Sequence, residues 1–83
     1  MDETTRIATR LLGRIRGDLL ETGESFGLDS DLFAAGLDSM SIMQIILFIE
    51  EEFAVKLPDG AVTRATFSTA RRIAEAIRQT QSL

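Results

Sequence analysis

Apolar residues near the N-terminus recur at the spacing of a helix. Spacings of three, four and five positions relate Ile7, Leu11, Leu12, Ile15, Leu19 and Leu20. This pattern predicts one apolar stripe on an amphipathic helix from about Asp2 to Leu20. Gly13 and Gly17 each weaken a helix by about 1 kcal/mol relative to alanine, so we expect its later turns to depend on packing.

The next segment, ETGESFGLDSDLFAAG at 21–36, has three glycines and apolar residues only at isolated points. This composition predicts a long ordered loop, anchored by Phe26, Leu28, Leu32 and Phe33. Ordered loops of this length are uncommon in a small domain unless they are functional, which directs attention to the segment that follows.

A second helix is predicted to begin after Asp38, which is a favourable N-cap, and to run through SMSIMQIILFIEEEF at 39–53. One side carries Met43, Ile46, Ile49, Glu50 and Phe53, of which all but the glutamate suit a core. Five further positions are also apolar, namely Met40, Ile42, Ile45, Leu47 and Phe48. More than one face of this helix must therefore be buried or contact another molecule. The charged run at 50–52 could be read as a metal or docking cluster, but a solvated face is the preferred interpretation.

The remaining chain predicts an extended link at 54–58, a turn at Pro58, a short helical turn within 60–67 and a last helix capped by Ser68. Its inward face consists of Ala70, Ile73, Ala74 and Ile77, and its outward positions include Arg71, Arg72 and Arg78. The predicted fold class is all-α. We expect a small antiparallel bundle of three main helices and one short helix, a four-helix bundle with a long loop between helices 1 and 2.

Length and composition limit the possible functions. The 83 residues suffice for one domain, and 45% apolar with 27% charged residues is typical of a folded globular chain. A net charge of −4 disfavours nucleic acid as a partner. Without cysteine or histidine, the chain lacks a thiol nucleophile and the commonest general base, so we do not expect an enzyme or a metal site. We expect a monomer without a membrane span, located in the cytoplasm, and the ends at Met1 and just past the last helix favour a standalone chain.

Ser39 needs no function on local grounds, because serine in the first turn of a helix helps to satisfy free backbone donors. Its context is more specific. The pattern Asp-Leu-Phe-x-x-Gly-Leu-Asp-Ser-Met at 31–40, an aliphatic helix and then Glu-Glu-Phe-x-Val-x-Leu-Pro at 51–58 closely resemble the acyl carrier protein superfamily. That superfamily includes peptidyl and aminoacyl carriers. The resemblance extends to the closing TFSTARRIAEAI and so covers nearly the whole chain.

The resemblance implies that residues 1–83 form a single carrier-protein domain and that Ser39, between Asp38 and Met40, is the attachment point of 4′-phosphopantetheine. The arm would come from coenzyme A through a phosphopantetheinyl transferase, giving a phosphoprotein. A helix N-terminus suits the phosphodiester so formed, since its free N–H groups and dipole favour an anion. No base in the chain could activate Ser39, and Asp38 should be ionised, so another enzyme must modify the serine. The arm would then carry cargo as a thioester.

The residues after Ser39 bear on the cargo. Fatty-acid-synthesis carriers usually have acidic residues two and five positions after the modified serine, where this chain has Ser41 and Gln44. The Asp-Leu-Phe at 31–33 looks more like the peptidyl, aminoacyl and D-alanyl carriers. The partners so implied are an adenylate-forming acyl or aminoacyl ligase and a downstream acyltransferase or synthase.

Met40, Ile42 and Leu47 are the predicted apolar docking patch for these partners, and core packing is the competing interpretation for Ile42 and Leu47. Methionine suits a surface that meets several enzymes, because it repacks readily. Two alternatives stay open at this point. One is an acyl carrier of fatty-acid or polyketide synthesis, and the other is an unmodified helical module that binds a partner through its second helix.

Overall fold

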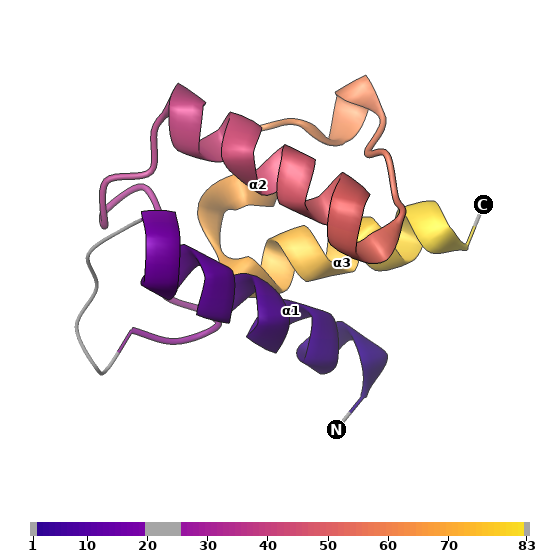
Figure 1. Cartoon of the computed structure of the whole chain (residues 1–83), viewed down its shortest axis with the longest axis horizontal. Coiled ribbons are helices and arrows are strands. Elements are labelled where there is room, and N and C mark those ends of the chain that lie inside the picture. The colour runs from indigo at the N-terminus through magenta and orange to yellow at the C-terminus, as the bar shows by residue number, and fades with distance from the viewer. Residues whose placement is uncertain (1, 20–25, 83) are drawn as a thin grey trace.

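The computed structural model describes residues 2–19 and 26–82, and every regular element in these two ranges is helical. The three α-helices are α1 (Glu3–Arg14), α2 (Ser39–Phe53) and α3 (Ala70–Gln81) (Figure 1). Shorter elements are the π-helical turn η1 (Ile15–Leu19) and the 3-10 turns η2 (Asp59–Ala61) and η3 (Thr66–Ser68). The predicted all-α class and its three main helices are therefore confirmed, and two 3-10 turns take the place of the short helix. Leu20 and positions 21–25 of the predicted loop lie outside the described residues.

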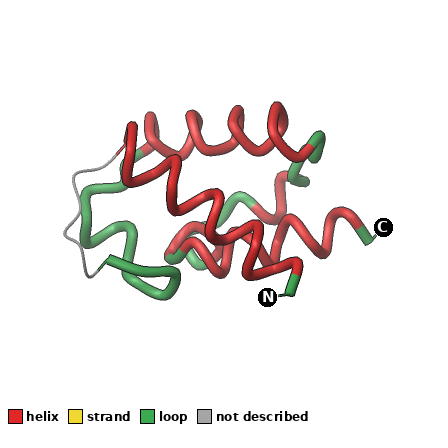
Figure 2. The backbone as a smooth tube through the Cα atoms, turned by 60° about the horizontal axis from the view of Figure 1, so that its bottom comes forward, coloured by secondary structure: helices red, strands yellow, loops and turns green. Residues whose placement is uncertain are grey.

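The helices form two levels. α1 packs directly against α3, and α2 lies along one side of this pair (Figures 1 and 2). α1 runs in the opposite direction to both α2 and α3, because the connection at 54–69 returns the chain to the end of the molecule where α2 begins (Figure 1). In the part of the chain that the structure describes, no helix has the length and apolar character that crossing a membrane requires.

α1 shows the weak C-terminal end that its glycines predict. Its N-terminus is regular, since the Asp2 side chain accepts a hydrogen bond from the Thr5 N–H at 2.7 Å. After Gly13 the α-helical pattern stops at Arg14, and the chain continues as the wider π turn. Ile15, at the start of this turn, is fully buried, so packing holds the irregular segment in place.

The core lies between the α1–α3 pair and the inner side of α2. Phe67, from η3, is its largest fully buried side chain. The predicted inward positions of α3 are all fully buried, as are those of α1 apart from the half-buried Leu12 and the undescribed side chains at 19 and 20. The core cluster comprises Ile7, Ala8, Leu11, Ile15, Leu32, Leu37, Ile45, Ile49, Val55, Leu57, Phe67, Ile73, Ala74 and Ile77.

The predicted cap of α3 is wrong by one residue. Thr69, in extended conformation, caps the helix by accepting the Arg72 N–H at 3.0 Å. Ser68 instead belongs to η3, where its hydroxyl donates to the Ala65 carbonyl at 2.7 Å. Serine and threonine are both good caps. Because the Ser68 hydroxyl is bound within the 3-10 turn that buries Phe67, the cap of α3 is Thr69 instead.

Candidate functional site

The turn that leads to α2 begins with a side-chain cap. The Asp31 carboxylate accepts the backbone N–H groups of Phe33 and Ala34 at 2.9 and 3.3 Å. These bonds fold 31–36 into a single compact turn, since aspartate readily satisfies backbone donors two or three residues beyond it. The first residue of the Asp-Leu-Phe pattern thus has a local structural role.

The same turn closes with a glycine in the left-handed region. The Leu37 N–H donates to the Leu32 carbonyl at 3.0 Å, and the Gly36 N–H donates to the Phe33 carbonyl at 3.1 Å. Gly36 has φ of 105°, which a residue with a Cβ rarely adopts. This is the Schellman arrangement, and the residues that flank it, Leu32 and Leu37, are both buried. The turn is therefore fixed to the core on both sides, and it ends two residues before Asp38.

Backbone and charged contacts attach the loop to the start of α3. The Leu32 N–H donates to the Ser68 carbonyl at 2.8 Å, and the Arg71 N–H donates to the Leu28 carbonyl at 3.0 Å. The Arg71 guanidinium also binds the Asp29 carboxylate at 2.8 Å. The predicted loop anchors are confirmed, with Leu32 fully buried and Phe26, Leu28 and Phe33 partly buried against the core.

Asp38 caps α2 as the sequence predicts. It is extended (φ −130°, ψ −177°), and its carboxylate accepts the Ser41 N–H at 2.9 Å. This hydrogen bond, chiefly, lowers the pKa of Asp38 below its ordinary value of 3.8. Asp38 therefore remains a carboxylate near neutral pH and is a poor base for the adjacent hydroxyl.

Ser39 is the first residue of α2, and it is exposed. Its side chain opens onto a shallow, mainly apolar depression lined by Ser39, Met40, Met43 and Gln44. A group attached to its oxygen would extend into solvent beside the free N–H groups of the first helical turn. An anionic product is favoured at this position by the helix dipole.

The apolar residues of α2 divide between two opposite faces. Ile45 and Ile49 point into the core, at 1% and 0% exposure, and Phe48 and Phe53 flank them, half-buried. The prediction that Met43 faces inward is wrong, because Met43 is 59% exposed. The predicted inward face centres on Ile46, whereas the observed inward face is rotated around the helix and includes Ile45 and Ile49. A helix that is apolar on two faces gives no clear periodic signal to distinguish them.

The outer face of α2 carries an apolar patch, which we define as Met40, Met43 and Leu47. Their exposures are 73%, 59% and 50%, and their spacing of three and four places them on one face. Met40 and Leu47 belong to the docking residues predicted from sequence, whereas Met43 was missed. Ile42, the third predicted docking residue, is half-buried against the core and offers less surface. The spacing of 40, 43 and 47 is the signal that could have identified the patch.

Arginines of α1 hold the far end of α2. Arg10 forms an ion pair with Glu52 and lies over the Phe53 ring, 5.9 Å from its centroid. Arg14 lies over the Phe48 ring at 5.4 Å. Glu52 therefore links α1 and α2. The sequence interpretation placed 50–52 on a solvated face and did not predict this contact. No group of three or more histidine, cysteine, aspartate or glutamate residues within 2–19 and 26–82 is arranged to hold a metal ion.

The structure thus places an exposed serine at the first turn of a capped helix, beside an apolar patch. Comparison with protein families gives the class. The family described as "Phosphopantetheine attachment site" matches residues 8–77, most of the chain. The chain belongs to this family of carrier domains, whose cofactor is a covalently attached 4′-phosphopantetheine.

Similar proteins place the chain within the carrier superfamily as the sequence predicts. The aminoacyl carrier protein of Agrobacterium fabrum is 32% identical over 62 residues, which cover 75% of each chain. The D-alanyl carrier protein of Streptococcus equi subsp. zooepidemicus is 38% identical over 55 residues, or 65% of this chain and 70% of that protein. The predicted resemblance to the aminoacyl and D-alanyl branch is confirmed by these relatives.

A solved structure shares the fold. It is an engineered Bradyrhizobium japonicum glycine:carrier protein ligase complexed with a carrier protein from Agrobacterium tumefaciens and ATP. The match covers 92% of this chain and 97% of the matched chain, at 27% identity and a TM-score of 0.73.

Proposed function

We propose that this protein is an aminoacyl carrier that is primed with 4′-phosphopantetheine on Ser39. An adenylate-forming ligase transfers an amino acid to the thiol of the arm, and a downstream acyltransferase or synthase removes it. The protein contributes the attachment point and docking surfaces but no catalysis. The observation that carries this proposal is the exposed Ser39 hydroxyl at the capped start of α2, in a chain of the phosphopantetheine family.

Priming requires that Ser39 oxygen attack the phosphorus of coenzyme A that bears the pantetheine arm. A new phosphorus–oxygen bond forms, the pyrophosphate bond breaks, and adenosine 3′,5′-bisphosphate leaves. The serine proton passes to a base of the transferase, since the one carboxylate beside Ser39 is occupied as a cap and its pKa is lowered. Asp38 thus orients the helix start and does not activate the nucleophile.

The outer face of α2 supports the choice of partners. Residues 39–49 carry no charge, and Ser41 and Gln44 stand where fatty-acid carriers usually have acids. Docking through the apolar patch therefore depends on shape and apolar contact more than on charge. The relatives named as aminoacyl and D-alanyl carriers support an amino acid as cargo. The location in the cytoplasm and the monomeric state stay predictions.

The attachment site is tested by incubation with coenzyme A and a broad-specificity phosphopantetheinyl transferase, followed by intact mass spectrometry. We expect the wild-type chain to gain one phosphopantetheinyl group and Ser39→Ala to gain none. Ser41→Ala is a matched control, because it removes a hydroxyl from the same helical turn and leaves the Asp38 cap intact. Priming of Ser39→Ala, or absence of priming in the wild type, would refute the site and leave the unmodified helical module as the better interpretation.

The cargo is tested on the primed protein with ATP, an adenylate-forming ligase and a panel of glycine, D-alanine, L-alanine and a short fatty acid. Formation of an aminoacyl thioester, released by hydroxylamine, is the expected result. Loading of the fatty acid alone would favour the alternative acyl carrier of fatty-acid or polyketide synthesis.

A further inference from the structure

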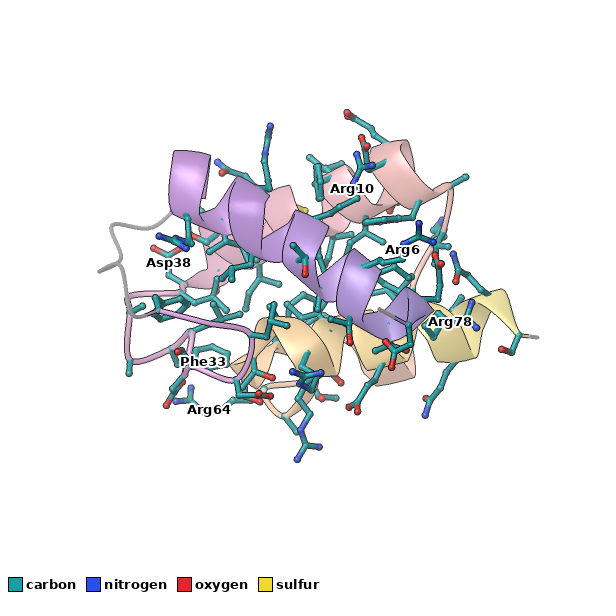
Figure 3. All side chains as sticks on the ribbon, turned by 90° about the horizontal axis from the view of Figure 1, so that it is seen from below. Arg6, Arg10, Phe33, Asp38, Arg64 and Arg78 are labelled. Carbon is teal, nitrogen blue, oxygen red and sulfur yellow. The ribbon has the colours of Figure 1, made fainter. Side chains whose placement is uncertain are left out.

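Arg64 is held against an aromatic ring in the turn that leads to Ser39. Its guanidinium carbon lies 4.1 Å from the centroid of the Phe33 ring, closer than Arg10 lies to Phe53 or Arg14 to Phe48. Arg64 comes from the connection between η2 and η3, and Phe33 comes from the capped turn at 31–36. Figure 3 shows the two side chains together, at the end of the molecule where Asp38 also lies.

The charge of Arg64 has no carboxylate partner in the part of the chain that the structure describes. Three other arginines bind one each, in the pairs Arg6–Glu3, Arg10–Glu52 and Arg71–Asp29. Arg64 is exposed, so its contact with the Phe33 ring restricts the guanidinium while its N–H groups remain accessible. A planar guanidinium fixed in this way binds a carboxylate at a smaller entropy cost than a mobile side chain.

α2, which carries the apolar patch, contains no lysine or arginine. Residues 39–49 of α2 are uncharged, and the acidic Asp29, Asp31 and Asp38 precede them. Arg71, which also contacts this loop, is already paired with Asp29. In a chain of net charge −4, the ordered Arg64 is therefore well suited to orient a partner that the apolar patch alone would leave free to rotate.

We propose that Arg64 is a specificity contact that receives a carboxylate on the surface of the adenylate-forming ligase. This inference rests on the proposed function, because the ligase is its partner. Phe33 is the positioning residue that holds the guanidinium in place. The apolar patch supplies contact area, and Arg64 sets the orientation in which the arm on Ser39 enters the ligase.

The test measures ligase loading of enzymatically primed variants at saturating ATP and amino acid, with the carrier as varied substrate. The first ligase used is the Bradyrhizobium japonicum glycine:carrier protein ligase, followed by a D-alanine-activating ligase. For Arg64→Gln we expect about a tenfold rise in KM with kcat nearly unchanged, as for loss of one charge-assisted hydrogen bond. Arg64→Lys and Phe33→Leu should each raise KM about threefold. Arg64→Lys keeps the positive charge but lacks the planar guanidinium, and Phe33→Leu keeps the guanidinium but removes the ring that orders it.

Arg78→Gln is the matched control. It removes the same charge from an exposed position at the opposite end of the molecule (Figure 3). We expect its KM to equal that of the wild type, and we expect high salt to reduce the difference between wild type and Arg64→Gln.

Distinct results would overturn the inference. Equal KM for wild type and Arg64→Gln, or equal loss in Arg78→Gln, would show that Arg64 makes no specific contact. A changed ³¹P chemical shift of the primed Arg64→Gln variant would show that the arm's own phosphodiester is the anion. If Arg64→Gln lowers both the melting temperature and kcat, and Arg64→Lys does not restore them, the role of Arg64 is structural. If neither ligase loads the wild-type protein, the proposed ligase partnership itself fails, independently of Arg64.

Discussion

Replacing Met40 with glutamate separates docking from folding. Met40 is 73% exposed, so about a quarter of its surface is covered. Full burial of a methionine side chain contributes about 1.5–3 kcal/mol, which makes the loss about 0.4–0.8 kcal/mol here. The first turn of α2 carries no acidic residue, and a new carboxylate there gains about 0.3–1 kcal/mol from the helix dipole. These two effects nearly cancel, and we expect the melting temperature to change by less than about 4 °C.

Loading by the ligase should respond much more strongly. A carboxylate brought into an apolar contact without a partner loses hydration, and each 1.4 kcal/mol of that cost lowers association by about tenfold. We expect kcat/KM for aminoacyl loading of the primed variant to fall by at least about tenfold. Priming is carried to completion first, so that an effect on the transferase does not enter the measurement.

Gln79→Glu on α3 provides the control, because it adds the same charge at an exposed position away from α2. It should load like the wild type. Loss of helical signal or a fall in melting temperature of more than about 8 °C in Met40→Glu would show that Met40 is a core residue. Unimpaired loading would show that the apolar patch is not the docking surface.

Three further substitutions test the frame around Ser39. Gly36→Ala places a Cβ at φ of 105° and should destabilise the protein by about 1–3 kcal/mol in chemical denaturation, with slower priming; equal stability would refute the strained-turn argument. Asp38→Asn should reduce stability above the ordinary carboxyl pKa of 3.8, because the lowered pKa of folded Asp38 contributes stability there, and the difference from wild type should vanish as pH falls through that lowered value in thermal melts. Ala54→Gly should raise stability by about 0.5–1 kcal/mol, since Ala54 ends α2 at φ of 55°, and an unchanged or lower melting temperature would contradict this.

Much of the site could be predicted because its determinants are local. Asp38 caps the helix that follows it, and Asp31 and Gly36 close a turn within six residues, so short-range hydrogen bonds suffice to place Ser39. The same holds for the inward face of α3, where small and aliphatic residues alternate with arginines at helical spacing. Sequence patterns report such features well, since each depends on neighbours in the chain.

The errors arise where tertiary contacts decide between locally equivalent choices. Ser68 and Thr69 are both suitable caps, and the packing of Phe67 selects Thr69. Met43 and Ile45 are both apolar, and only the position of α2 over the α1–α3 pair determines which one is buried. No periodic pattern distinguishes two apolar faces of one helix.

The contact between Arg64 and Phe33 is also a feature that tertiary structure decides, and so is the orientation of any partner. Arg64 looks like a solubilising residue in the sequence, because its aromatic partner lies in a different loop. Under the proposed function, the local motif supplies the attachment point of the arm, and the specificity of docking comes from residues that the fold assembles around it. Two carriers with the same Asp-Ser-Met motif can differ in their ligases through a single long-range contact of this kind, which is why variants of Arg64 and Met40 must be compared in the same loading assay.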